Sequence, residues 1–153
     1  MGIEIERKFL VIGDDWKLLG VGEYISQGYL SRDPARTVRV RIKGEQAWLT
    51  IKGRSVGASR AEFEYPIPLA DAQQMLALCD GPRVEKVRRL VPYAGMVWEV
   101  DEFLGDNAGL VVAEIELSSA DQRFELPPWA GAEVTEDARY FNSQLTKHPF
   151  SIW

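Results

Sequence analysis

The sequence predicts an α+β protein built mainly from antiparallel β-strands, with enough strands to close into a barrel. Runs of alternating apolar and polar residues occupy most of the 153 residues, whereas helical periodicity is confined to short stretches. Glycine, proline and aspartate separate these runs at short intervals, which is typical of strand connections. No low-complexity segment or long linker divides the chain, so we expect one domain over residues 1–153.

Eight of the alternating runs are predicted to be strands. They cover Ile3–Val11, Gly22–Ser31, Thr37–Lys43, Gln46–Gly53, Ala61–Ile67, Arg83–Val91, Val97–Phe103 and Val111–Ser118. The spacing of apolar residues predicts a helix over Leu69–Leu78 and a short helix over Asp15–Leu19. A terminal helix is expected over Glu136–Leu145, because Thr135 is a suitable N-cap and acidic residues follow it.

The composition is that of an ordinary soluble globular protein, with 46% hydrophobic and 27% charged residues. A formal net charge of -5 argues against nonspecific nucleic-acid binding, and no apolar run approaches the ~20 residues of a membrane span. The N-terminus lacks the layout of a signal peptide. The single cysteine, Cys79, cannot form an internal disulfide, so we expect a cytoplasmic protein with Cys79 as a small buried hydrophobe.

Charged residues recur at every second position of the predicted strands. Alternate side chains of a strand share one face, so Glu4, Glu6 and Lys8 project together, with neighbours about 7 Å apart. Like charges share a face elsewhere too: Arg39 with Arg41, Glu62 with Glu64, Lys86 with Arg88, Glu99 with Asp101, and Glu114 with Glu116. One such pair is typical of a solvated face, but here whole strands divide into acidic and basic ones. The pattern leaves open which face is inward.

The charged rows offer two kinds of ligand chemistry. The carboxylates supply only oxygen ligands, which suit Mg²⁺, Mn²⁺ or Ca²⁺ rather than zinc, and the lone His148 is expected on the surface. The basic side chains could clamp phosphates: Lys8, Arg39, Arg41, Lys52, Lys86 and Arg88. Carboxylates, a divalent metal and several cations together indicate phosphoryl chemistry, although no P-loop is present.

Taken in order along the chain, these residues resemble the CYTH family, also called the triphosphate tunnel metalloenzymes. The family signature Glu-x-Glu-x-Lys is met by Glu4, Glu6 and Lys8. Further similarity follows at residues 37–41, 49–52, 62–64, 85–88, 99–101, 113–117 and 134–142. A lone signature would be weak, but this ordered set spans nearly the whole chain.

The resemblance implies an eight-stranded antiparallel β-barrel, open as a tunnel, with a charged interior and a few covering helices. It implies Mg²⁺ or Mn²⁺ as cofactor, held by Glu4, Glu6, Asp101, Glu114 and Glu116. It assigns triphosphate binding to Lys8, Arg39, Arg41, Lys52, Lys86, Arg88 and Arg139, with Lys8, Arg41 and Glu6 expected to carry catalysis. Arg139 could reach the tunnel mouth or pack on its own helix. Glu62 and Glu64 could orient water or metal or pair with the basic groups, Tyr29 is expected in the core, and the role of Glu99 is open.

The expected activity is hydrolysis of inorganic triphosphate to pyrophosphate and phosphate. The compact chain resembles the short bacterial members, and it lacks a His-Phe pair near its start that is associated with the cyclase branch. The alternatives are a class IV adenylyl cyclase, a thiamine or nucleoside triphosphatase, a polyphosphate-binding module without turnover, and an open sheet with solvated charges. The expected partner is a small triphosphate, with no nucleic acid or membrane, and a homodimer is allowed.

Overall fold

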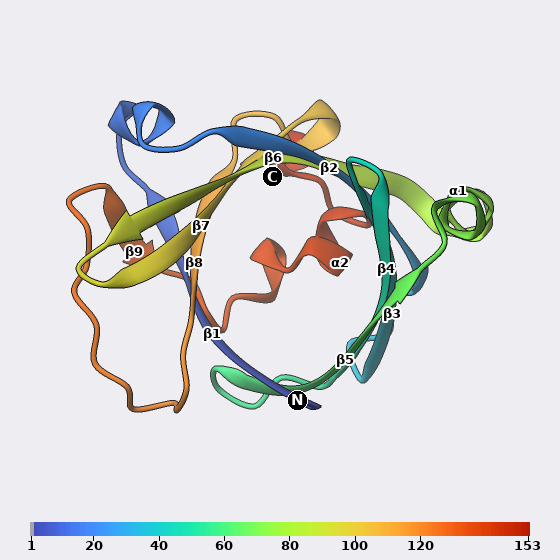
Figure 1. Cartoon of the computed structure of the whole chain (residues 1–153), viewed down its shortest axis with the longest axis horizontal. Coiled ribbons are helices and arrows are strands. Elements are labelled where there is room, and N and C mark those ends of the chain that lie inside the picture. Colours follow the sequence, from blue (N-terminus) through green and yellow to red (C-terminus); the bar gives the residue numbers. More distant parts are fainter. Residues whose placement is uncertain (1) are drawn as a thin grey trace.

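The computed structural model describes residues 2–153 and contains a closed antiparallel β-barrel (Figure 1). The strands that build the ring are β1 (Gly2–Val11), β2 (Gly22–Ser31), β3 (Arg36–Lys43), β4 (Gln46–Gly53), β5 (Ser59–Ile67), β6 (Asp80–Tyr93), β7 (Met96–Phe103) and β8 (Val111–Glu116). Their order is β5-β4-β3-β2-β6-β7-β8-β1, and pairing of β1 with β5 closes the circle. The eight predicted strands and the predicted fold class are therefore confirmed.

Strand ends differ modestly from the prediction. Strand β6 is longer at both ends, and β8 stops at Glu116 rather than Ser118. A further strand, β9 (Ala130–Glu133), pairs with the end of β1, with a register shift between Phe9 and Val11. Its four residues are too few to show a period of two, so the sequence pattern did not reveal it.

The helix α1 (Leu69–Leu78) forms as predicted and covers the outer face of β2, β3 and β4. Its buried residues Ala72 and Leu76 pack against Val40 and Ala47. Helix η1 (Asp15–Leu18) is a single 3-10 turn near the end of β1. Of the helices within residues 2–153, none has the length and apolar character needed to cross a membrane.

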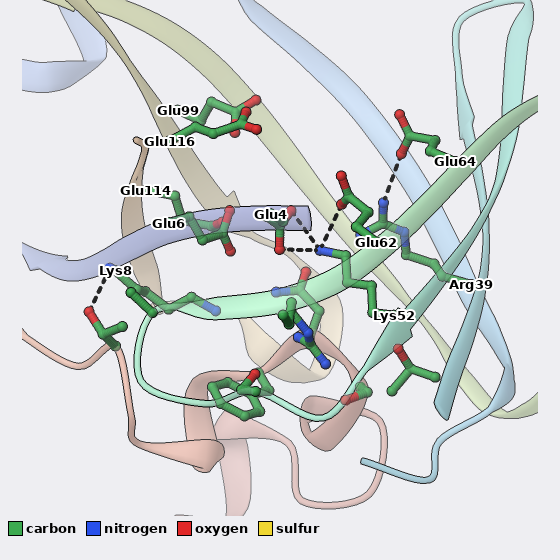
Figure 2. Close-up of a pocket in the computed structure, with 18 of the residues that line it drawn as sticks. Glu4, Glu6, Lys8, Arg39, Lys52, Glu62, Glu64, Glu99, Glu114 and Glu116 are labelled. Carbon is green, nitrogen blue, oxygen red and sulfur yellow. Dashed lines mark hydrogen bonds and ion pairs between the residues drawn. The ribbon is translucent and has the colours of Figure 1, made fainter. Parts of the chain in front are cut away.

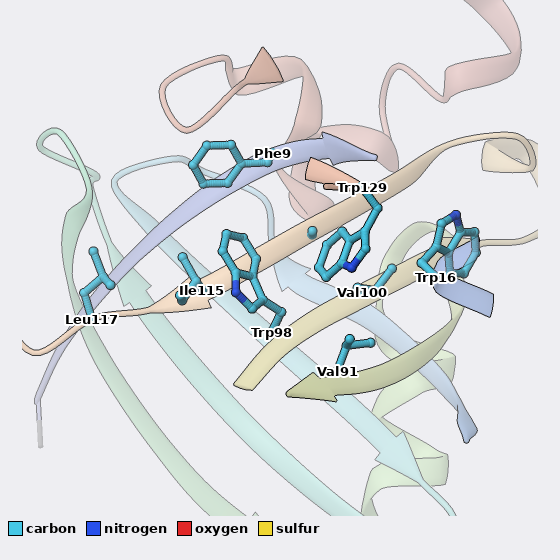
Figure 3. Close-up of a cluster of buried hydrophobic side chains, with 9 residues drawn as sticks. Phe9, Trp16, Val91, Trp98, Val100, Ile115, Leu117 and Trp129 are labelled. Atoms are coloured by element: carbon cyan, nitrogen blue, oxygen red, sulfur yellow. The ribbon is translucent and has the colours of Figure 1, made fainter. Parts of the chain in front are cut away.

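A second apolar layer covers the outer face of β1, β7 and β8 (Figure 3). Trp98 is completely buried there, with its ring centroid 5.6 Å from those of Phe9 and Trp129 in edge-to-face contacts. Trp129 and Phe124 come from the long segment between β8 and β9. Because the apolar side chains of these strands face outward into this layer, the alternating charged side chains must face the barrel interior.

The predicted helix over Glu136–Leu145 is wrong. This segment forms a 3-10 turn, η3 (Ala138–Tyr140), and a short helix, α2 (Asn142–Leu145), separated by Phe141 in an extended conformation. Thr135 is not an N-cap, because its hydroxyl accepts a hydrogen bond of 3.0 Å from the backbone of Lys8. Contacts with the barrel thus override the local helix signals.

The C-terminal segment fills one end of the barrel. Tyr140 and Leu145 pack against Val84, Phe103 and Val112. Each of these lies two positions from a charged inner residue of its own strand and so faces inward as well. Figure 1 shows α2 lying across the opening of the ring. A last 3-10 turn, η4 (Phe150–Ile152), follows, and His148 is exposed as predicted. The interior is therefore apolar at this end and charged above it.

Candidate active site

A cavity of about 190 Å³ lies inside the barrel and is lined mainly by charged side chains (Figure 2). Most of the predicted site residues line it: Glu4, Glu6, Lys8, Arg39, Arg41, Lys52, Lys86, Arg88, Glu114 and Glu116. Glu62, Glu64, Glu99 and Tyr29 line it as well, and Tyr29 is also buried in the barrel wall. The strand alternation therefore turns the charged rows toward one shared space.

Strand order places most acidic and most basic side chains on different parts of the barrel, although Lys8 lies opposite Glu114 and the acidic Glu62 and Glu64 lie on β5. The acidic wall comes from the consecutive strands β7, β8 and β1, where Glu6 lies opposite Glu116 and Glu99 lies opposite Glu114. Strands β3, β4 and β6 form the basic wall, which carries Arg39, Arg41, Lys52, Lys86 and Arg88. Like charges about 4 Å apart repel by about 4 kcal/mol at an effective dielectric constant of about 20. Each wall therefore favours ligands of the opposite charge.

The acidic wall is electrostatically strained. Burial raises the pKa of Glu6 well above its ordinary value, and repulsion from Glu114 and Glu4 acts in the same direction. Burial acts to raise the pKa of Glu114 as well, but the attraction of Lys8 and a hydrogen bond with Glu6 lower it. The contact between Glu6 and Glu114 is therefore favourable when one of them keeps a proton or when a cation binds.

The donor set of this wall suits a hard divalent cation. Glu4, Glu6, Glu114 and Glu116 offer oxygen atoms only, the ligands that Mg²⁺ and Mn²⁺ prefer. Within residues 2–153, no three acidic, histidine or cysteine side chains are already gathered around one point. Binding an ion would therefore require these long side chains to change rotamer.

Glu62 and Glu64 pair with the basic wall. Lys52 Nζ lies 3.0 Å from both carboxylate oxygens of Glu4 and 3.4 Å from Glu62 Oε2. Glu64 Oε2 lies 3.5 Å from Arg39 Nη2 (Figure 2). Of the two readings that the sequence left open for these residues, pairing with cations is the one the geometry displays.

Asp101 does not join the other predicted metal ligands. It is completely buried, is not among the residues that line the cavity, and accepts hydrogen bonds from Arg88 Nε (2.7 Å), Arg88 Nη2 (2.8 Å) and Lys86 Nζ (2.7 Å). Burial would raise the pKa of Asp101, but Arg88 and Lys86 lower it far below its ordinary value. Both oxygens are committed to these cations, so the structure makes Asp101 a counter-ion of the basic wall.

Arg139 lies outside the cavity. Its Nη2 is 2.8 Å from Asp137 Oδ2, and its guanidinium stacks over Tyr140 and Trp153. The side chain is 62% exposed. The interruption of the predicted terminal helix explains the difference, because it changes the direction in which residue 139 projects.

Sequence reasoning missed several lining residues. Arg60 shares the inner face of β5 with Glu62, and Thr37 shares the inner face of β3 with Arg39. Extending each alternation by one step would have found both. The remaining missed residues lie outside the strands, in connecting segments or at the start of α2: Ser55, Gly57, Ala58, Thr135, Phe141, Asn142 and Ser143. No periodic signal marks these positions.

The basic wall has unused capacity to bind an anion. Burial lowers the pKa of Arg41 to about 9, and repulsion from Arg39 and Arg88 adds to the effect. Burial likewise lowers the pKa of Lys86 to about 7, against the attraction of Asp101. Within residues 2–153, Arg39 Nε is buried without a hydrogen-bond partner. A multiply charged anion would relieve the repulsion and supply the missing acceptor.

A family model described as the CYTH domain matches residues 2–149. The chain belongs to the CYTH domain family. It is 50% identical over 151 residues to an inorganic triphosphatase from Acetivibrio thermocellus, covering 98% of this chain and 97% of that relative. It is 38% identical over 148 residues to an inorganic triphosphatase from Nitrosomonas europaea, covering 93% and 95%.

Solved structures share the fold of this CYTH domain. The crystal structure of an inorganic triphosphatase matches with a TM-score of 0.65 and 35% identity, over 93% of this chain and 96% of that one. An adenylyl cyclase candidate from Hippeastrum, described as having dominant triphosphatase activity, matches with a TM-score of 0.56. Its identity is 13%, over 78% of this chain and 80% of that one, so it shows a common fold alone.

Proposed function

We propose that this chain hydrolyses inorganic triphosphate to pyrophosphate and phosphate with the help of a divalent metal, Mg²⁺ or Mn²⁺. The observation that carries this proposal is the pair of opposed charged walls inside one cavity. A metal-bearing acidic wall and a phosphate-binding basic wall are the parts that phosphoryl transfer needs. The names of the two curated relatives support the same substrate.

Glu4, Glu6, Glu114 and Glu116 would hold the metal. The chemistry that a divalent ion supplies there is neutralisation of charge on phosphate oxygens and activation of the attacking water. The chain itself keeps these carboxylates apart from the cations of the opposite wall, except for the Glu4–Lys52 pair. Asp101 would act indirectly, by holding Arg88 and Lys86 in place.

The basic side chains would bind and orient the triphosphate. Arg39 and Arg41 project from β3 and present planar guanidinium groups, which suit two oxygen atoms at once. Lys52 projects from the neighbouring strand β4, and Arg88 projects from β6, which β2 separates from β3. Arg41 and Lys8 would offset the negative charge that develops on the phosphate groups during bond cleavage.

The proposal is tested by incubating the protein with tripolyphosphate, ATP or thiamine triphosphate in the presence of Mg²⁺ or Mn²⁺. Phosphate, pyrophosphate and cyclic AMP are then measured. We expect tripolyphosphate to be the best substrate and equal amounts of phosphate and pyrophosphate to appear. Cyclic AMP as the main product, or no release of phosphate at any metal concentration, would overturn the assignment.

The metal assignment is tested separately with Glu116→Gln. We expect kcat to fall by at least ~10²-fold, with little change in the affinity for tripolyphosphate measured without metal, because this carboxylate would place the ion. Glu125→Gln is the matched control, since Glu125 is exposed on the segment that covers the outer wall. Full activity of Glu116→Gln would remove this residue from the metal site.

A further inference from the structure

Two neutral amide side chains connect the cations at the floor of the cavity. Gln27 projects inward from β2 and is completely buried, whereas Asn142 begins α2 and lines the cavity. Gln27 Nε2 donates a hydrogen bond of 2.9 Å to Asn142 Oδ1. The pair thus joins the barrel wall to the C-terminal segment.

The neighbouring cations determine how both amides are oriented. Arg41 Nε donates to Gln27 Oε1 over 2.9 Å, and Lys86 Nζ donates to Asn142 Oδ1 over 2.8 Å. Neither cation can accept a hydrogen bond. The Gln27 oxygen must therefore face Arg41, which leaves its nitrogen to face Asn142. Turning either amide around would place N–H groups against N–H groups.

This orientation leaves the amide nitrogen of Asn142 available to a ligand. Within residues 2–153, Asn142 Nδ2 makes no hydrogen bond, and it is not among the buried side-chain atoms that lack a partner. Nδ2 is therefore not a buried atom, and it belongs to a residue that lines the cavity. An amide NH₂ offers two donors and no charge. It can strengthen an anion site without adding repulsion beside Arg41 and Lys86.

The position of Asn142 in the fold indicates which part of the substrate it would meet. Tyr140 and Leu145 pack on inward-facing apolar residues and fill the end of the barrel next to Asn142. A linear ligand that fills the cavity therefore has one of its ends at this floor. The terminal phosphoryl group of a polyphosphate carries three non-bridging oxygens, all of them acceptors, which match a floor that presents donors.

We infer that Asn142 contacts the substrate, donating from Nδ2 to a terminal phosphoryl oxygen at the closed end of the cavity, and that Gln27 is the positioning residue that holds Asn142 in this orientation. The inference rests on the proposed function and adds a specificity-determining contact to it. The amide pair selects a free phosphoryl terminus, because an uncharged or apolar end group would leave the donors of Asn142 and Lys86 without acceptors.

The contact is tested by calorimetry with inorganic tripolyphosphate in the absence of divalent metal, and by steady-state kinetics with metal. Asn142→Asp keeps an oxygen for Gln27 and Lys86 but loses the NH₂ donors, and Asn142→Ala loses the donors without adding charge. We expect both variants to bind tripolyphosphate about ten- to a hundredfold more weakly. The matched control is Asn107→Asp, because Asn107 Oδ1 also anchors the C-terminal segment, at the backbone of Phe150, but lies outside the cavity.

A direct readout is made on the unaltered protein. The side-chain NH₂ signals of Asn142 in a ¹H–¹⁵N spectrum of the unaltered protein are identified by their loss in Asn142→Asp. We expect these signals to move when tripolyphosphate is added without metal. Signals that stay in place, or affinities within twofold of the unaltered protein for both variants, would overturn the inference while turnover of tripolyphosphate by the unaltered protein still supported the proposed function.

The positioning role of Gln27 is tested with Gln27→Glu. In this variant one carboxylate oxygen still faces Arg41, but the donor to Asn142 is lost. The other carboxylate oxygen faces Asn142 as a new acceptor and draws the NH₂ group of Asn142 away from the cavity. We expect weaker binding and a smaller movement of the Asn142 NH₂ signals, although Asn142 itself is unchanged. Movement equal to that in the unaltered protein would show that Gln27 has only a structural role. If the unaltered protein neither binds nor hydrolyses tripolyphosphate, this inference and the proposed function both fail.

Discussion

Asp101 and Arg139 show how contacts, rather than residue type, decide what a charged side chain does. Both match the family pattern in the sequence, yet Asp101 is completely buried behind Lys86 and Arg88, and Arg139 is paired on the surface with Asp137. Their chemical type allows a role in the site, whereas in this structure both side chains are engaged in ion pairs with other protein groups. Two predictions at the residue scale follow from this difference.

Arg41→Ala should lower kcat/KM for tripolyphosphate by about 10²–10³-fold, because it removes a half-buried cation of the cavity that would face the phosphate groups. Arg139→Ala should leave kcat/KM within about twofold, since Arg139 does not line the cavity. Steady-state phosphate release measures both values. Equal losses in the two variants would mean that Arg139 reaches the substrate and that the cavity changes shape when it binds.

Asp101→Asn should lower the free energy of unfolding by about 3 kcal/mol, because it removes the charge that compensates two buried cations. Urea denaturation of the metal-free protein measures this loss. Glu116→Gln serves as the comparison and should change stability little, since Glu116 makes no salt bridge within residues 2–153 and is exposed. A stable Asp101→Asn variant with impaired metal binding would show instead that Asp101 is a metal ligand.

At the scale of elements, the alternation of each strand can be predicted from the sequence, because it does not depend on the rest of the fold. The conformation of the C-terminal segment does depend on it. Residues 136–145 carry a plausible helix start and helical residues, yet Phe141 is extended and Tyr140 turns into the barrel. Burial of Tyr140 and Leu145 at the end of the barrel outweighs a helix that would be too short to be stable alone. Helix α1 has no such conflict, because the apolar face predicted from its sequence is also the face that packs against the sheet.

The packing of α1 against β2 depends on Gly28. A Cβ atom at this position would lie 3.0 Å from Cys79 Sγ and 3.2 Å from Leu76 Cδ2. We expect Gly28→Ala to lower the free energy of unfolding by about 1–3 kcal/mol, measured by urea denaturation, because α1 must move away from the sheet. The double variant Gly28→Ala, Cys79→Ala should recover part of this loss. No loss in the single variant would show that α1 is loosely packed.

At the scale of the whole molecule, the barrel confines opposite charges that an ordinary surface would hydrate. The eight strands leave two walls facing each other, and the outer apolar layers prevent the alternation from being reversed. Stability should therefore depend on the ions that fill the cavity, and the dependence should have a predictable direction with pH.

Between about pH 5 and pH 7, the free energy of unfolding of the metal-free protein should fall as the pH rises. Glu6 has a raised pKa in the folded protein and therefore releases its proton at a higher pH than it does in the unfolded chain, where the ordinary value is 4.5. Asp101 and Glu114 have lowered pKa values, so they change the free energy of unfolding only at lower pH. Lys86 has a pKa of about 7 in the folded protein, so above this pH range it makes the free energy of unfolding rise with pH.

Adding Mg²⁺ or Mn²⁺ should remove this pH dependence, because the carboxylates bind metal only after losing their protons. Thermal denaturation across the same pH range, with and without metal, measures the effect. We expect the increase in Tm caused by metal to grow with pH. A constant increase, or none, would argue against metal binding at Glu6 and its neighbours.

Much of the fold and most of the cavity lining could be predicted from the sequence, because both follow from a local rule. Successive side chains of a strand point to opposite faces, so Glu4 and Glu6 share a face wherever the strand is placed. The recurrence of like charges then indicates oxygen-rich and cation-rich surfaces without any knowledge of strand order.

Only the tertiary structure decided which charges meet. The closure of β1 on β5, the pairing of Arg88 with Asp101, and the entry of Asn142 into the cavity join residues far apart in the chain. Strand register and the path of irregular segments depend on packing summed over the whole molecule, and no periodic signal records them. For this reason the sequence determined which side chains face inward, whereas the structure determined which of them remain free to bind a ligand.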